Sequence, residues 1–330
     1  MKNFPVTNST LSATHLGLFL QDKYNFSSKA SCSLLKTGIN DTYVVTDNEV
    51  KFIFRVYSLN WRTVNEINEE IRLLNLLREN HIPVSYPLTD TAGDYIQELN
   101  APEGKRFGVL FSFAKGVKQL NFSPELHYKA GEIMARMHQV TLGLSLDRVV
   151  YSPKVVLVDS FEQLKKFLPA NTAEMDFMVA AQQYLLTEFE KINYNEIRQG
   201  TLHLDIWFDN LAIYNGTEIT IFDFDFCGNG MLCYDIAYYI LQLNSTEKDE
   251  TECKLKTEAF LTGYESITKI SKEEKRILPM LGVSLYFFYL GIQCRRFDNW
   301  SNTFLNEGYL KRFINLLVKK YFEKNGLGLS

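Results

Sequence analysis

The sequence has few of the features that mark secreted, disulfide-stabilised or nucleic-acid-binding proteins. It contains five cysteines, an odd number at irregular spacing, and no CxxC pair. This pattern disfavours a disulfide framework or a structural zinc site, and it is typical of the reduced thiols of a cytoplasmic protein. The formal net charge of −4 comes without a strongly basic stripe, which disfavours nucleic acid as a partner.

Targeting signals and long apolar runs are also scarce. The first residues lack the basic and apolar regions of a signal peptide. The most apolar stretch, residues 277–292, is short for a membrane span, contains Pro279 and is flanked by charged sequence. We interpret it as a buried core helix and expect a cytoplasmic protein with no membrane partner. A hydrophobic content of 46% is enough for a sizeable core.

The patterns that are present divide the chain into two parts. One helical pattern at residues 64–80 lies among four strand-like runs, at residues 42–46, 50–57, 95–99 and 107–114. From Ser123 onward the pattern is mostly helical, so we expect a boundary near residues 115–122. We therefore predict an α+β fold. Residues 1–115 would form an antiparallel sheet with one main helix, and residues 116–330 would be mostly helical.

One β-rich stretch, HLDIWFDNLAIYNGTEITIFDFDF, interrupts the helical part and contains four aspartates. Its Asn-Gly pair at residues 215–216 predicts a two-residue type I′ hairpin turn, because that turn needs positive φ at both positions. With that turn, Asn210 lies opposite Ile221 and enters the hairpin at the end where Asp223 leaves it. Asp205 lies on the loop leading into the hairpin.

The residues Asp205, Asn210 and Asp223 are therefore expected to lie near one another. Carboxylate and amide oxygens are ligands that suit Mg²⁺, whereas zinc prefers His or Cys, of which only His203 is near. Taken singly, each residue is more readily explained as a turn residue or helix N-cap. Together they favour a metal site.

The order H-x-D-x-x-x-x-N, a strand and then D-F-x resembles the catalytic loop and metal motif of kinases. The sequence is similar to the kinase-like phosphotransferases: aminoglycoside phosphotransferases, choline kinases, and homoserine kinase and bacterial stress-response kinase relatives. Further segments resemble that family in the same order, at residues 37–45, 52–57, 69–88, 130–138 and 233–240.

The resemblance implies a bilobal protein-kinase-like fold and the ATP- and Mg²⁺-dependent transfer of a phosphoryl group to a hydroxyl of a small molecule. Asp205 would accept or orient the hydroxyl proton. Asn210 and Asp223 would hold Mg²⁺, and Asp225 would either help to do so or bind a backbone amide. Two further residues, His203 and Asp235, would support the catalytic loop.

The resemblance also implies the nucleotide-binding residues. Arg55 takes the position of the phosphate-binding base, with Glu70 as its expected partner and Glu66 and Glu69 as rivals. The chain lacks a G-x-G-x-x-G motif, and Gly38 is the one glycine of the nucleotide loop. The remaining residues expected to contact ATP are Asn40 in that loop and the backbone of Ser112, Phe113 and Ala114 at the hinge.

Several alternatives remain open. A Ser/Thr protein kinase of the stress-response type is disfavoured by the absence of an APE segment between Asp223 and Asp235. A non-catalytic, nucleotide-binding pseudokinase is disfavoured by the presence of all the motif residues. The acceptor could be an aminoglycoside, an amino alcohol, or a homoserine-like or sugar-like molecule. Aromatic residues of the C-terminal helices, such as Tyr289, and the lone helical His138 are expected to pack in the core.

Overall fold

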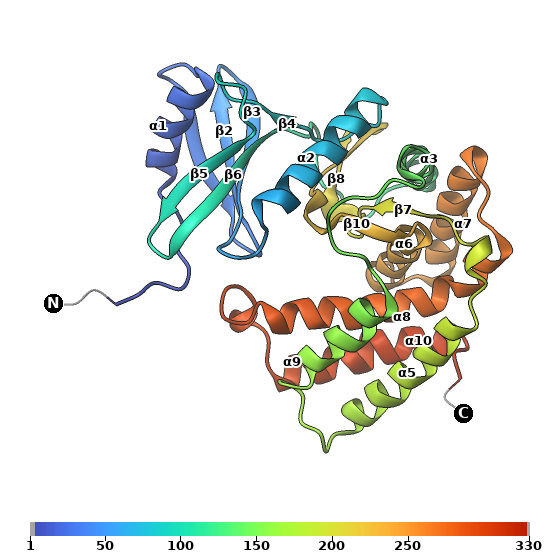
Figure 1. Cartoon of the computed structure of the whole chain (residues 1–330). Coiled ribbons are helices and arrows are strands. Elements are labelled where there is room, and N and C mark those ends of the chain that lie inside the picture. Colours follow the sequence, from blue (N-terminus) through green and yellow to red (C-terminus); the bar gives the residue numbers. More distant parts are fainter. Residues whose placement is uncertain (1–3, 329–330) are drawn as a thin grey trace. The chain divides into compact units, whose positions relative to one another are not determined.

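The computed structural model describes residues 4–328, which form two compact units (Figure 1). Within these residues, unit 1 extends to Lys115 and includes Asp298–Trp300, and unit 2 comprises Gly116–Phe297 and the residues from Ser301 onward. The division along the chain thus lies between Lys115 and Gly116. The α+β fold with an antiparallel sheet followed by a helical part is confirmed.

Unit 1 is built around a six-stranded antiparallel sheet in the order β1-β2-β3-β6-β4, with β5 also paired to β6. Its elements are α1 (Ala13–Tyr24), β1 (Ser31–Lys36), β2 (Asp41–Asp47), β3 (Val50–Val56), α2 (Val64–Glu79), β4 (Pro87–Leu88), β5 (Ile96–Ala101) and β6 (Gly104–Ser112). The expectation of one main helix is incomplete, because α1, β1 and β4 have no counterpart in it.

Helix α1 covers one face of the sheet (Figure 1). Ser12 caps its N-terminus by accepting a hydrogen bond from the backbone of His15. The buried Leu16 and Leu20 then pack with core residues of the sheet, among them Tyr43 and Phe54. Two buried leucines on a short helix are a weak periodic signal, which is why the sequence pattern did not reveal this helix.

Helix α2 packs on the side chains of the opposite face. Its N-terminus is a capping box in which Thr63 and Glu66 exchange side-chain and backbone hydrogen bonds. Side chains alternate along a strand, so Arg55 of β3 points to the face opposite to Phe54. The buried residues of α2 include Ile67, Leu74 and one charged residue, Glu70, whose side chain meets Arg55.

Unit 2 is mostly helical and carries two small antiparallel β-pairs, β8–β9 and β7–β10. Its longer elements are α3 (Pro124–Thr141), α4 (Ser160–Leu164), α5 (Ala173–Glu190), β7 (Gln199–Leu202), β8 (Leu211–Tyr214), β9 (Glu218–Ile221), β10 (Gly228–Met231), α6 (Cys233–Thr246), α7 (Glu250–Ile267), α8 (Lys272–Arg295), α9 (Glu307–Phe313) and α10 (Lys320–Lys324). Short helical turns connect them: η1 (Lys154–Asp159), η2 (Tyr194–Glu196), η3 (Phe208–Asn210), η4 (Phe224–Phe226), η5 (Ser301–Thr303) and η6 (Ile314–Lys319). The hairpin is therefore not the single β interruption of the helical part. Strands β7 and β10 flank it and pair with each other, which joins the two ends of the segment.

Helices α3 and α7 approach closely because a glycine of each faces the other's backbone. A β-carbon on Gly131 would lie 2.1 Å from the carbonyl oxygen of Phe260, and one on Gly263 would lie 1.9 Å from that of Tyr128. No side chain fits at such separations. Gly131 belongs to the 130–138 segment that resembles the family. The close contact with α7 explains why that segment has a glycine at this position.

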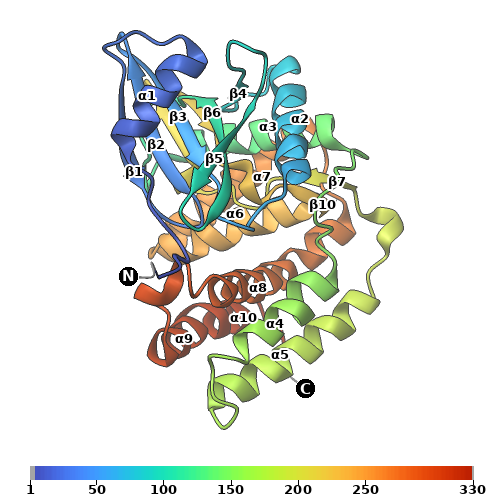
Figure 2. The ribbon, with the colours of Figure 1, turned by 60° about the vertical axis from the view of Figure 1, so that its left-hand side comes forward.

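Helix α8 contains the apolar stretch singled out in the sequence. Among the described helices, it alone is long and apolar enough to cross a membrane by length and composition. However, 83% of its apolar window is buried within the protein. In both views of the ribbon it lies alongside α10 and α4 (Figures 1 and 2). This agrees with the interpretation of residues 277–292 as a core helix.

Candidate active site

The hairpin of β8 and β9 brings the expected metal ligands to one end. Its turn has positive φ at Asn215 (50°) and Gly216 (67°), and the Thr217 amide donates to Tyr214 O at 3.1 Å. The predicted register is wrong by one residue, because the ladder resumes only after Thr217 and pairs Leu211 with Ile221.

The end of the hairpin is nevertheless closed as the sequence suggested. The Phe222 amide donates to Asn210 O at 3.1 Å, immediately before Asp223. Asn210 and Asp223 therefore lie on facing strand ends. Asp223 itself has a left-handed backbone, with φ of 66°. Such a conformation is strained for an aspartate and is typical of residues held in place at functional sites.

Asp205 and Asn210 contact each other directly. The Asn210 side-chain amide donates to Asp205 Oδ2 at 2.8 Å and to the Asp205 backbone oxygen at 2.9 Å. Asn210 is 3% exposed, whereas Asp205 is only partly buried. Because the Nδ2 atom is committed to Asp205, the Asn210 Oδ1 atom is directed away from that carboxylate and can serve another ligand.

His203 supports the loop through both ring nitrogens. It is fully buried, its Nε2 atom lies 3.1 Å from Phe222 O, and its Nδ1 atom lies 3.0 Å from the Asp205 amide. A carbonyl oxygen requires a donor at Nε2, and an N–H requires an acceptor at Nδ1. The ring is therefore neutral with its proton on Nε2, and it ties the loop to the end of the hairpin. The supporting role expected for His203 fits these contacts.

Asp235 anchors the same loop from α6. Its carboxylate accepts hydrogen bonds from the amides of His203 (3.0 Å) and Leu204 (2.6 Å), and it lies 3.0 Å from Nε2 of His138. The second ring nitrogen of His138 contacts the Tyr264 hydroxyl at 2.7 Å. Asp235 is fully buried, so it holds the loop without reaching solvent. His138, expected to be a packing residue, also belongs to this brace.

The oxygen ligands fit a magnesium ion better than a metal bound by a full cage of side chains. Within residues 4–328 there is no group of three or more His, Cys, Asp or Glu residues able to hold a metal. Mg²⁺ usually keeps several waters and binds one or two protein oxygens together with substrate phosphates. The Asn210 Oδ1 atom and the Asp223 carboxylate are oxygens of this kind, and their role as ligands stays a prediction. Asp225 is buried and its backbone oxygen accepts from Arg148 at 2.5 Å, but its role stays a prediction.

In unit 1, the buried partner of Arg55 is Glu70. Arg55 Nη1 lies 2.7 Å from Glu70 Oε1, and the Tyr57 hydroxyl donates to Glu70 Oε2 at 3.0 Å. The rival carboxylates have other tasks, because Glu66 completes the capping box of α2 and Glu69 pairs with Arg72 at 2.7 Å. The choice between the three glutamates is thus made by the helix face that is buried.

The structure gives different contacts to the other residues that are expected to bind ATP. A β-carbon on Gly38 would have 3.8 Å to its nearest neighbour, so packing alone does not demand glycine there. The Asn40 side chain accepts from the Ser58 amide at 3.2 Å and so braces the end of β3. The Ser112 amide donates to Tyr86 O at 2.8 Å, which leaves Phe113 and Ala114 as the candidates for adenine recognition.

Two tyrosines that the sequence reasoning did not assign to the site contact the catalytic loop. The Tyr238 hydroxyl donates to Asp205 Oδ1 at 2.5 Å, and the Tyr289 hydroxyl donates to the Leu204 backbone oxygen. Tyr289 was expected only to pack in the core. Tyr238 follows Asp235 by three residues on α6 and therefore lies on the same helix face. That spacing is the signal that could have identified it.

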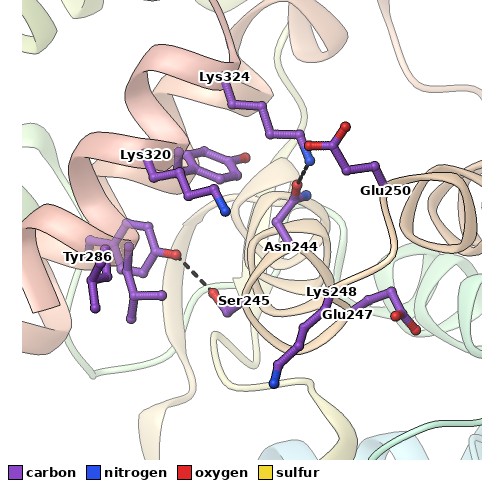
Figure 3. Close-up of a pocket in the computed structure, with 11 residues that line it drawn as sticks. Asn244, Ser245, Glu247, Lys248, Glu250, Tyr286, Lys320 and Lys324 are labelled. Carbon is purple, nitrogen blue, oxygen red and sulfur yellow. Dashed lines mark hydrogen bonds between the residues drawn. The ribbon is translucent and has the colours of Figure 1, made fainter.

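A cavity of about 430 Å³ lies in unit 2 (Figure 3). Its lining comes from the end of α6, the connection to α7 and the first residue of that helix, from α8, and from the last helices of the chain. Within it, the Ser245 and Tyr286 hydroxyls are 2.9 Å apart and Lys324 donates to Asn244 at 3.0 Å (Figure 3). None of the expected site residues lines this cavity.

The fold and the catalytic loop define a kinase-like phosphotransferase. The chain belongs to the phosphotransferase enzyme family, whose model matches residues 33–268. It is 27% identical over 259 residues to a homoserine kinase of Methylobacillus glycogenes, covering 78% of this chain and 77% of that protein.

Solved structures show the same fold. A microcompartment-associated aminopropanol kinase has a TM-score of 0.77 at 20% identity, covering 96% of this chain and 100% of the other. The amicoumacin kinase hAmiN in complex with AMP-PNP, Ca²⁺ and Ami has a TM-score of 0.74 at 19% identity, covering 97% and 95%. The predictions of the family, of the fold and of an enzyme that transfers phosphoryl groups to alcohols are confirmed at the level of the family.

Proposed function

We propose that this protein transfers the γ-phosphoryl group of ATP to the hydroxyl of a short amino alcohol, with Mg²⁺ as the metal. The observation that carries the proposal is the held carboxylate of Asp205. It is bonded to Asn210 at 2.8 Å, on a loop that meets the hairpin end beside Asp223. Phosphoryl transfer depends mainly on positioning and charge stabilisation, and this arrangement supplies both.

Each residue has a distinct task in this proposal. Asp205 accepts a hydrogen bond from the acceptor hydroxyl and orients its oxygen toward the γ-phosphorus atom. As the new P–O bond forms, the bond from the γ-phosphorus to the bridging oxygen breaks, ADP leaves, and the hydroxyl proton passes to the Asp205 carboxylate. Asn210 Oδ1 and the Asp223 carboxylate would hold Mg²⁺, which would supply positive charge to neutralise the phosphate oxygens. Arg55 donates to the phosphates of ATP, and Glu70 fixes the orientation of its guanidinium, which matches phosphate geometry as a planar fork.

The acceptor class rests on what two of the similar proteins have in common. One is named a homoserine kinase and the other an aminopropanol kinase. Homoserine and aminopropanol are both short molecules with one amino group and one hydroxyl. We therefore place short amino alcohols, including hydroxy amino acids, ahead of aminoglycosides and sugars. Activity with small molecules also fits a cytoplasmic location, which stays a prediction.

An acceptor screen tests the proposal. Purified protein with Mg²⁺ and ATP is assayed for ADP release on 1-amino-2-propanol, ethanolamine, choline, homoserine, aminoglycosides, hexoses and a generic protein substrate. We expect acceptor-dependent turnover with one of the short amino alcohols, and its loss in the Asp205→Ala variant and with EDTA. Asp209→Ala is the matched control, because Asp209 lies on the same loop but pairs with Lys118 at 2.9 Å.

The other outcomes decide between the alternatives. Phosphate on the protein substrate alone would favour a Ser/Thr protein kinase. Tight ATP binding without turnover on any acceptor would indicate a pseudokinase. A parallel series with GTP identifies the nucleotide, and mass spectrometry of the product identifies the phosphorylated hydroxyl.

A further inference from the structure

The carboxylate of Asp205 is held at both of its oxygens. Oδ2 accepts the Asn210 side-chain amide at 2.8 Å, and Oδ1 accepts the Tyr238 hydroxyl at 2.5 Å. A carboxylate rotates readily about its last torsion unless each oxygen has a partner. The two donors come from different elements, the loop itself and helix α6, so the carboxylate plane is fixed. An ionised carboxylate has about four acceptor positions, so an acceptor hydroxyl can still bind to it.

One face of α6 holds three consecutive residues of the catalytic loop. Asp235 binds the amides of His203 and Leu204, and Tyr238, one turn further along the helix, binds the side chain of Asp205. Tyr289 of α8 binds the Leu204 carbonyl oxygen. Leu204 needs this support because its φ is 66°, a left-handed value that is strained for leucine. The loop geometry is therefore imposed by the helices beneath it.

Tyr238 can only be a donor in this contact. The residue is 3% exposed, and burial raises the pKa of its hydroxyl well above the usual value, with the charge of Asp205 raising it further. A neutral phenol that donates to a carboxylate stabilises the ionised form of the carboxylate. Hydrogen bonds to charged groups are also about twice as strong as those between neutral groups.

We infer that Tyr238 is a positioning residue of the phosphoryl-transfer site, which fixes the orientation of the Asp205 carboxylate. This inference rests on the proposed function of Asp205. It assigns to Tyr238 a role beyond packing, because its hydroxyl touches the group that binds the acceptor.

Titratable side chains from three elements hold the loop around Asp205. They are His203 on the loop itself, Asp235 and Tyr238 on α6, and Tyr289 on α8. Burial also raises the pKa of Tyr289 well above its usual value, so both tyrosines stay neutral over the working pH range. Removal of the Tyr238 hydroxyl therefore changes the hydrogen bonding of Asp205 without changing the charge of the site.

The test compares Tyr238→Phe with Tyr239→Phe. Tyr239 is the next residue on α6, is also 3% exposed, and its hydroxyl contacts His127 at 2.8 Å, away from the loop. Each variant loses one buried phenol hydroxyl, so a general effect on folding is shared. We expect kcat of Tyr238→Phe to fall about 10- to 100-fold with KM for ATP unchanged. Tyr239→Phe should keep the wild-type kcat.

A second readout does not depend on turnover. The carbon-13 signal of the Asp205 carboxyl, identified by its loss in Asp205→Asn, is recorded at one fixed pH in the wild type and both variants. A changed chemical shift in Tyr238→Phe alone supports the inference, because the hydrogen bond to Oδ1 is lost only there. An unchanged signal with wild-type kcat in a folded Tyr238→Phe protein overturns it. Failure of the wild type to phosphorylate any acceptor would overturn the proposed function instead, and the carboxyl signal would still decide whether Tyr238 holds Asp205.

Discussion

The carboxylate of Asp235 offers the most sensitive test of how the catalytic loop is held. Asp235→Asn keeps the shape of the side chain but replaces one oxygen by an NH₂ group, which donates and does not accept. In the wild type both oxygens accept, from the amides of His203 at 3.0 Å and Leu204 at 2.6 Å. Whichever way the new amide is turned, its NH₂ group faces a backbone N–H that a carboxylate oxygen accepts in the wild type.

The expected loss of stability follows from these contacts. A hydrogen bond to a charged group contributes about 1.5–3 kcal/mol, and a buried donor without an acceptor costs a further 1–3 kcal/mol, roughly. The carboxylate is fully buried, so water does not replace it. His138 can partly relieve this loss. If its proton moves from Nε2 to Nδ1, the Nε2 atom can accept a hydrogen bond from the new NH₂ group. We therefore expect Asp235→Asn to lower the free energy of unfolding by about 2–4 kcal/mol.

Urea unfolding followed by circular dichroism measures this change, and steady-state turnover measures the effect on the loop. Asp249→Asn is the matched control. The Asp249 carboxylate also accepts two backbone amides, those of Thr251 and Glu252, but it is exposed at the N-cap of α7. Asparagine caps helices as well as aspartate, so the control should change stability by less than about 0.5 kcal/mol.

Turnover should fall in Asp235→Asn, the variant that loses stability, and not in the control Asp249→Asn. We expect kcat of Asp235→Asn to fall at least about tenfold, because Leu204 keeps its left-handed φ of 66° only while its amide is held. If Asp235→Asn unfolded within about 0.5 kcal/mol of the wild type and kept its kcat, the carboxylate would not be the anchor of the loop, and the reasoning would fail.

Three further predictions concern the site and its surroundings. Asp205→Ala should lower kcat by at least about 1,000-fold while isothermal titration shows ATP binding within about threefold of the wild type; turnover at the wild-type rate would remove Asp205 from the mechanism. Asp223→Ala should weaken nucleotide binding by at least about tenfold with Mg²⁺ present but not with EDTA, and equal Mg-ATP affinity in a titration would exclude it as a ligand. Hydrogen bonds from the Arg276 side chain and the Asn193 amide lower the pKa of Glu273 from 4.5 to about 2. Glu273→Gln should therefore destabilise the protein at neutral pH, and the difference should vanish in acid unfolding as the pH falls from 4.5 to about 2. A difference that stayed constant over this range would rule out the ion pair as its cause.

The amino-acid sequence by itself determined the features that depend on neighbours along the chain. The Asn215–Gly216 turn, the order of Asp205, Asn210 and Asp223, and the helical spacing of α2 follow from local backbone preferences and periodicity. These signals identified the hairpin, the facing ends of its strands and the family. They also indicated that the apolar stretch of α8 is a core helix.

Only the tertiary structure decided which partners meet across longer separations. Three glutamates on α2 were candidates for Arg55, and the choice of Glu70, 15 residues away in sequence, depends on which helix face is buried. Tyr238 meets Asp205 across 33 residues because α6 packs beneath the catalytic loop. Local preferences carry no information about such contacts, since burial and the packing of distant elements select one partner among several of equal chemistry.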